Sequence, residues 1–114
     1  MEATDTQVLI SMLILCNEID ETIERYGDTL DAFLIDKDYR KSVLLSILEI
    51  GEMSKELSDR FKKNTSTSIP WQRIRSYRNY IAHARHQLDY EEVFYTAKND
   101  IPLIMQFCED WVLP

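Results

Sequence analysis

Arg78 and His83, which are separated by four residues, are the pair in this sequence most suited to chemistry. A histidine, with a reference pKa of about 6.5, can accept the proton of a ribose 2′-hydroxyl or donate one to the leaving oxygen. An arginine can hold a phosphate through parallel hydrogen bonds and stabilise the charge of its transition state. This chemistry needs no metal, and DNA lacks the internal nucleophile. Arg78 and His83 are therefore candidate catalytic residues for cleavage of RNA phosphodiesters.

The element that carries this pair must bring two divergent side chains to one site. Each residue of a straight helix turns by about 100°, which separates Arg78 and His83 by about 140° around the axis. A single straight helix cannot direct both side chains at one atom. Two arrangements remain open: the helix loosens near His83, or two copies of it meet and supply groups from both chains to a shared cleft.

Basic residues are concentrated in one part of an otherwise acidic chain. The formal net charge is −7, but residues 60–88 contain no Asp or Glu and carry a formal charge of +7. The rest of the chain carries −14. The basic residues of this run are Arg60, Lys62, Lys63, Arg73, Arg75, Arg78 and Arg85.

This basic run has two interpretations. It can be a face that attracts a phosphate backbone at short range, with Arg73, Arg75 and Arg85 in contact with RNA and with weak, salt-sensitive binding. It can also be a solvated helix face together with the loop before it. The first interpretation makes RNA the expected partner.

Composition and length predict a single domain over residues 1–114, because 45% hydrophobic content over 114 residues is typical of a globular core. Cys16 and Cys108 occupy apolar helical positions and are expected to be buried thiols in a reducing compartment rather than a disulfide. The first residues are acidic, unlike a signal peptide, and the apolar stretch 8–16 is too short to span a bilayer. We therefore expect a cytoplasmic protein without a membrane partner.

Metal and cofactor sites are not predicted. His83 and His86 lie three residues apart with no third ligand nearby, which is a weak metal signal. The sequence contains no glycine-rich phosphate loop.

Apolar spacing predicts helices throughout. A first helix is expected between a cap at Asp5 and a stop at Gly27, and a short helix or turn over 29–35. A long helix over 39–61 contains Gly51, which suggests a close helix contact or a bend. Residues 62–68 have the composition of a loop.

The second half of the chain predicts two further helices. One starts at Pro70 and runs through 86, with a buried stripe of Trp71, Ile74, Tyr77 and Ile81. The last is expected to start at Asp89, with Glu92 completing a capping box, and to be kinked at Pro102. Short connections between these helices predict an all-α, mostly antiparallel four- to five-helix bundle.

Three more side chains have competing interpretations. Trp71 and Trp111 are expected in the core rather than as platforms for base stacking. Glu52 can reach toward Arg78 across the bundle or remain a solvated helix residue.

Five segments together resemble the HepT-like branch of the HEPN superfamily in order and spacing. They are Ile50-Gly51-Glu52, Ile69-Pro70-Trp71, the Arg78 to His83 motif, Asp89, and Lys98-Asn99-Asp100-Ile101-Pro102-Leu103. The resemblance implies a HEPN-type helical bundle that forms a homodimer, with the Arg-x4-His helices of two protomers facing each other across a cleft. It also implies a metal-independent RNase with Arg78 and His83 as catalytic residues and Asn79 as a supporting polar residue.

The resemblance further implies a toxin and antitoxin pair whose second member is a minimal nucleotidyltransferase of the MntA type. The family motif commonly continues to a tyrosine that the antitoxin modifies with AMP, but here that position is Arg85. If the antitoxin adenylylates this chain, Tyr90 is a candidate for the modified residue. If it does not, we expect it to occlude the cleft.

A second function of a different class stays open. The chain can be a non-catalytic helical dimer that binds a minimal nucleotidyltransferase or presents its substrate. Cleavage of RNA that is lost in His83→Ala distinguishes the two functions.

Overall fold

The computed structural model describes residues 2–82 and 87–113, and the secondary structure of these residues is helical apart from one isolated bridge. This confirms the predicted all-α bundle. The elements are α1 (Ala3–Tyr26), α2 (Leu30–Ile35), α3 (Lys37–Ser54), α4 (Asp59–Thr65), α5 (Trp71–Arg75), α6 (Tyr77–Ile81), α7 (Tyr90–Tyr95), the π-helical η1 (Thr96–Asp100) and α8 (Ile101–Val112). None of the helices in the described part is long and apolar enough to cross a membrane.

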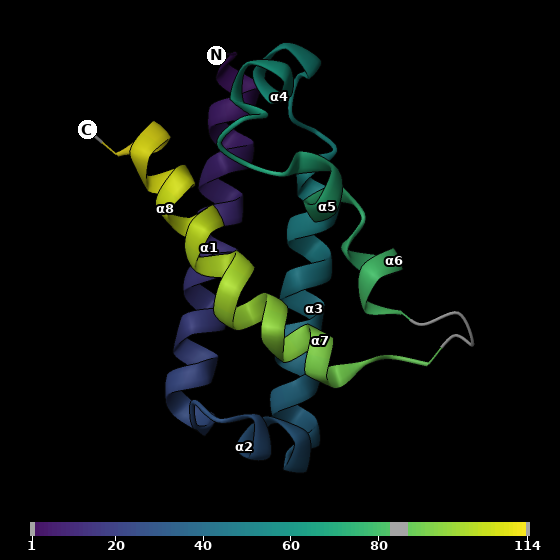
Figure 1. Cartoon of the computed structure of the whole chain (residues 1–114). Coiled ribbons are helices and arrows are strands. Elements are labelled where there is room, and N and C mark those ends of the chain that lie inside the picture. Colours follow the sequence, from purple (N-terminus) through teal and green to yellow (C-terminus); the bar gives the residue numbers. More distant parts are fainter. Residues whose placement is uncertain (1, 83–86, 114) are drawn as a thin grey trace.

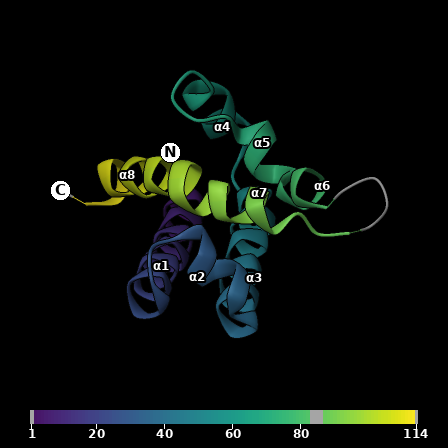
Figure 2. The ribbon, with the colours of Figure 1, turned by 60° about the horizontal axis from the view of Figure 1, so that its bottom comes forward.

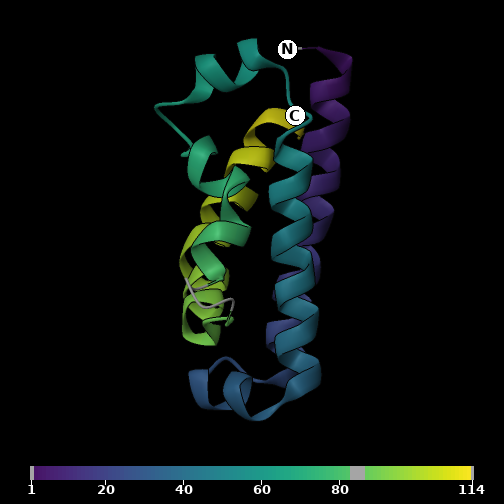
Figure 3. The same cartoon turned by 90° about the vertical axis from the view of Figure 1, so that its right-hand side faces the viewer.

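The helices form two layers. The long helices α1 and α3 run antiparallel and side by side, joined at one end by α2 (Figure 1). The stretch α7–η1–α8 crosses them diagonally, as the tilted view also shows (Figure 2). Seen from the side, α5 and α6 lie in the same layer as α7 and α8, and α4 covers the end opposite α2 (Figure 3). Tertiary packing therefore places α6, the helix that carries Arg78, on α3.

The core is built from the apolar stripes that the sequence predicts. Both cysteines are free and buried, as expected, and burial raises the pKa of the Cys108 thiol to about 12. Trp71 is buried, and its Nε1 donates a hydrogen bond of 2.8 Å to Thr65 Oγ1. Trp111 is 45% exposed, so its predicted core position is wrong. It packs on the rim, with its ring centroid 5.1 Å from that of Phe61.

The start of α1 differs from the prediction in which Asp5 was its cap. Glu2 is the N-cap, and Asp5 is the reciprocal residue of a capping box inside the helix. Asp5 is buried and accepts hydrogen bonds of 2.7 Å from both the backbone N–H and the hydroxyl of Ser58. Burial acts to raise the pKa of the Asp5 carboxyl, but the hydrogen bonds from Ser58 and Glu2 outweigh it and lower the pKa below its ordinary value.

The predicted helix over 39–61 is divided into α3 and α4. α3 ends at Ser54, and Ser58 begins α4 as an N-cap that accepts from the Phe61 N–H. Because Ser58 also donates to Asp5, the break joins α4 to the start of α1. The predicted loop over 62–68 is correspondingly wrong at its start, where α4 continues to Thr65.

The last helical stretch begins as predicted and contains an irregularity just before Pro102. Asp89 caps α7 by accepting from the backbone N–H groups of Glu91 and Glu92. The irregularity is the π-helical segment η1, where the Ile101 N–H donates to the Thr96 carbonyl five residues back. Pro102 lies in the first turn of α8, and the kink predicted there stays a prediction.

Candidate functional site

The segment around Arg78 is two short helices instead of the single helix predicted over 70–86. α5 and α6 are separated at Ser76, whose backbone N–H donates to the carbonyls of Gln72 and Arg73. α6 ends at Ile81, and Ala82 is extended with φ −88° and ψ 123°. The angle of 140° expected for a straight helix does not apply, because the helix ends before His83.

Gly51 explains how this segment approaches α3 so closely. A Cβ added at Gly51 would lie 2.8 Å from the backbone carbonyl oxygen of Ile74 and 3.6 Å from the Cβ of Tyr77. Of the two predicted reasons for the glycine, the close helix contact is therefore confirmed. Gly51 lets the end of α5 and the start of α6 rest directly on α3.

Residues 81–82 pair with residues 88–89 through backbone contacts. Ala82 and Leu88 form an isolated antiparallel bridge, and the Asp89 N–H donates to the Ile81 carbonyl at 3.1 Å. These contacts bring Ala82 and Leu88 together at the end of α6. His83, Arg85 and His86 lie outside the described residues, so the roles predicted for His83 and Arg85 stay predictions.

α6 presents Arg78 and Asn79 to solvent while its two ends are buried. Tyr77 and Ile81 belong to the core, as the sequence predicts. Arg78, Asn79 and Tyr80 are exposed. Among the described residues, no carboxylate forms an ion pair with Arg78. Its guanidinium can therefore bind an external anion without breaking an ion pair in this part of the chain.

Arg73 has a different environment, although the sequence groups it with Arg75. Its Nε lies 2.7 Å from Asp100 Oδ2, its Nη2 lies 3.3 Å from Glu92 Oε1, and its guanidinium carbon lies 5.0 Å from the centroid of the Tyr80 ring. The hydrogen bond to Asp100 raises the pKa of the Arg73 guanidinium. Arg73, predicted to contact RNA, is thus used inside the fold.

The Tyr77 hydroxyl completes this cluster by donating to Asp100 Oδ2 at 3.3 Å. Burial raises the pKa of the Tyr77 hydroxyl, which stays protonated and able to donate. We call the five residues Arg73, Asp100, Glu92, Tyr77 and Tyr80 the Arg73 clasp. It connects α5, α6, α7 and η1.

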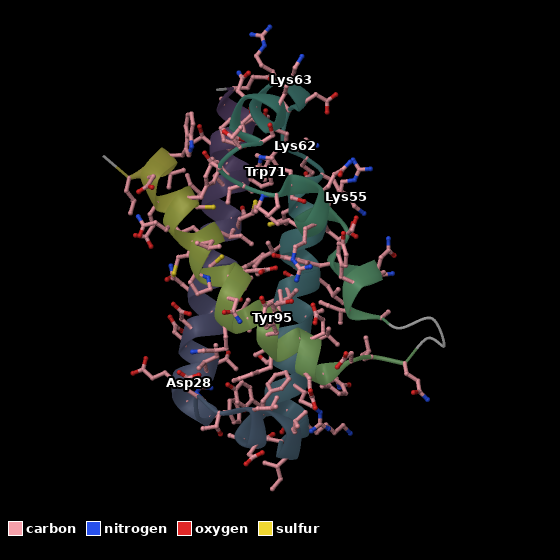
Figure 4. All side chains as sticks on the ribbon, viewed as in Figure 1. Asp28, Lys55, Lys62, Lys63, Trp71 and Tyr95 are labelled. Atoms are coloured by element: carbon pink, nitrogen blue, oxygen red, sulfur yellow. The ribbon has the colours of Figure 1, made fainter. Side chains whose placement is uncertain are left out.

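Arg75 is exposed and lines a cleft of about 190 Å³ between α4 and α5. Lys62 lines the same cleft, together with Ser54, Asp59, Trp71 and Gln72. The Lys62 side chain is only 18% exposed, and its nearest carboxylate oxygen, on Asp59, is 3.9 Å away. Figure 4 shows Lys62 and Lys63 toward the α4 end of the molecule, with Trp71 nearby. The sequence placed Lys62 in the basic run but did not pair it with Arg75.

Two other predicted residues have partners away from Arg78. Glu52 is 61% exposed and forms an ion pair of 3.1 Å with Lys55, which confirms the solvated interpretation. Tyr90 is partly buried at the start of α7, where the Arg40 guanidinium lies 5.0 Å from its ring centroid.

Within residues 2–82 and 87–113, no three His, Cys, Asp or Glu side chains are grouped as metal ligands.

Comparison with known proteins identifies the family of this chain. The model of the family described as "Ribonuclease HepT-like" matches residues 15–111. A protein of Thermococcus cleftensis named "Probable ribonuclease HepT" is 32% identical over 87 residues, which cover 75% of this chain and 78% of the relative. No solved structure matches the chain significantly.

The family match includes α6, the clasp and the stretch α7–η1–α8 up to residue 111. It therefore covers every described residue that the geometry associates with Arg78. On this match and this relative, the chain belongs to the ribonuclease HepT-like family.

Proposed function

We propose that this protein is a metal-independent endoribonuclease with Arg78 and His83 as its catalytic residues. The observation that carries the proposal is the position of Arg78: an exposed arginine without an ion pair to any described carboxylate, on a helix that ends two residues before His83, in a chain of the ribonuclease HepT-like family. The name of the Thermococcus relative supports the same activity.

The reaction uses the ribose 2′-oxygen as nucleophile. The 2′-oxygen forms a bond to phosphorus, the bond to the 5′-oxygen breaks, and the products are a 2′,3′-cyclic phosphate and a 5′-hydroxyl. His83 takes the proton of the 2′-hydroxyl or gives one to the departing 5′-oxygen, and water exchanges the other proton. Arg78 binds the non-bridging phosphate oxygens and stabilises the charge that grows on them, with Asn79 as a supporting donor.

RNA binding is assigned to the exposed Arg75 and to Lys62 beside it, whose side chain is 18% exposed and whose ion pair with Asp59 is long at 3.9 Å. Arg75 and Lys62 line one cleft and can hold a phosphate away from the scissile bond. Arg85 stays a proposed contact, in the segment outside the described residues. Arg73 is not assigned to RNA, since Asp100 and Glu92 already hold its guanidinium.

The proposed assembly is a homodimer in which the α6 helices of two protomers face a shared cleft. The exposed side of α6, with Arg78, Asn79 and Tyr80, is the surface that this arrangement would bring together. The proposed physiological role is that of a toxin with an MntA-like minimal nucleotidyltransferase as antitoxin. With Arg85 at the family's tyrosine position, we expect inhibition by occlusion, and Tyr90 is the candidate if AMP is added.

The test is cleavage of RNA by the purified protein in the presence of EDTA. We expect cleavage by the wild type and loss of it in both His83→Ala and Arg78→Ala, while the exposed Arg25→Ala serves as a matched control and remains active. A DNA strand of the same sequence should not be cleaved. A wild-type protein that binds a minimal nucleotidyltransferase but leaves RNA intact would instead establish the non-catalytic alternative.

A further inference from the structure

We propose that Arg73 is a positioning residue for Arg78, acting through the Arg73 clasp instead of through contact with RNA. This inference rests on the proposed function, because it concerns the orientation of the proposed catalytic arginine. It assigns separate tasks to two arginines that the sequence does not distinguish. Arg73 orients α6, and Arg75 faces the substrate.

The first step is that α6 cannot hold its own position. It contains five residues, whereas isolated helices shorter than about 12–15 residues are marginal in water. Ser76 interrupts the helix on one side, and Ala82 is extended on the other. The direction in which Arg78 points is therefore set by the contacts of its neighbours in the helix.

The two neighbours that make these contacts, Tyr77 and Tyr80, both belong to the clasp. Tyr77 precedes Arg78 and donates its hydroxyl to Asp100, and Tyr80 follows two residues later with its ring under the Arg73 guanidinium. On the opposite side, Tyr77 packs against Gly51 of α3. α6 is thus held between α3 and η1, with one clasp contact on each side of Arg78.

The geometry requires an arginine at position 73. Two different nitrogens of one guanidinium reach two carboxylates, and its central carbon also lies over an aromatic ring. A lysine has a single ammonium group and cannot make these three contacts with the same geometry. The side chains of Arg73 and Asp100 are 28% and 19% exposed, so water replaces lost contacts only in part.

The irregular segment η1 ends at the clasp carboxylate. A π-helical turn disturbs the regular backbone hydrogen bonds, and here the Asn99 side-chain amide donates to the Tyr95 carbonyl at 3.0 Å. Such turns are rare and are often found at functional sites. Asp100 is the last residue of this turn and the residue that joins Arg73 to Tyr77.

The experiment compares kcat and KM for RNA cleavage in Arg73→Lys, Asp100→Asn and Glu92→Gln. We expect Arg73→Lys and Asp100→Asn to lower kcat by about 10- to 100-fold, with KM changed less than about twofold, because misplacement of a catalytic group mainly affects the chemical step. Glu92→Gln, which weakens the longer ion pair, should show the same pattern at smaller size. Lys98→Met is the matched control: it removes the surface ion pair with Asp28 from the same η1 segment and should leave both constants unchanged.

Hydrogen exchange gives a readout that does not depend on activity. The backbone amides of Asn79, Tyr80 and Ala82 donate to carbonyls within the segment, at 2.8, 3.0 and 3.0 Å. We expect these amides to exchange faster in Arg73→Lys, while the amides of α1 and α3 stay as protected as in the wild type. Preserved protection in α1 and α3 also shows that the variant is folded.

The outcomes separate the two proposals. A raised KM with unchanged kcat would make Arg73 an RNA contact and overturn the clasp, as would unchanged exchange of the α6 amides. A wild type that does not cleave RNA would overturn the proposed ribonuclease. In that case the exchange measurement still decides whether Arg73 orients α6.

Discussion

The short segment α5–α6 differs from the paired long helices α1 and α3 because it adds specific contacts to hydrophobic burial. α1 and α3 have 24 and 18 residues, and their buried residues recur at helical spacing along the whole length. α5 and α6 have five residues each. They depend on the contact with Gly51, on the buried rings of Trp71 and Tyr77, and on the clasp. Hydrophobic burial thus provides the frame, whereas specific polar contacts orient the proposed catalytic arginine.

The largest expected effect comes from opening a cavity in the frame. Ile47 on α3 is fully buried, and Ile47→Ala should lower the free energy of unfolding by about 2–5 kcal/mol. Urea denaturation measures the change. Leu45→Ala on the same helix removes an exposed side chain and should stay within about 0.5 kcal/mol of the wild type. Equal effects of the two variants would contradict the burial described for α3.

Gly51→Ala probes the contact between the two regions. Helix propensity alone would stabilise the protein by about 1 kcal/mol, but the new Cβ would meet the Ile74 carbonyl oxygen at 2.8 Å. Because that neighbour is backbone, we expect a net loss of about 1–3 kcal/mol. Comparing Glu49→Ala with Glu49→Gly, at an exposed position of α3, gives the glycine-to-alanine propensity effect without the clash. A more stable Gly51→Ala protein would show that α5 and α6 do not lie this close to α3.

Asp5→Asn tests the polar contact that joins α1 to α4. The lowered pKa of Asp5 means that its stabilising effect is complete above the unfolded value, near 3.8, and is lost as the pH falls through the lower folded pKa. We expect a loss of about 1 kcal/mol at pH 7 and a smaller difference from the wild type below pH 4. Urea midpoints at several pH values measure it, with the exposed Asp31→Asn as control. A difference that does not depend on pH would contradict the role of the carboxylate charge.

The last prediction concerns RNA binding by the cleft between α4 and α5, where substitutions are expected to have the smallest effect on stability. Arg75→Met and Lys62→Met should each weaken RNA binding and reduce the slope of log affinity against log salt concentration by about 0.7, the value for one phosphate contact on a single strand. Fluorescence anisotropy with labelled RNA at several salt concentrations measures both quantities. Arg25→Met on α1 is the control. Unchanged slopes would remove the cleft from the proposed RNA surface.

Regular periodicity made most of the frame predictable. The stripes of α1 and α3, the Asp89 cap of α7 and the buried face of α5 and α6 all follow from local spacing and local capping chemistry. The Arg78 and His83 pair was equally visible, because its residues are close in sequence. The break between α3 and α4 was not, since Ser58 caps α4 while also bonding to Asp5, 53 residues earlier.

The sequence by itself therefore determined the helical class, the buried faces, the family and the candidate catalytic pair. Only the tertiary structure decided which arginine of the basic run is free to face a substrate. Arg73 and Arg75 look alike in sequence, but Asp100 and Glu92, 27 and 19 residues beyond Arg73, form ion pairs with Arg73 and not with Arg75. Such long-range partners leave no local pattern, because they depend on where the chain folds back and not on the spacing along it.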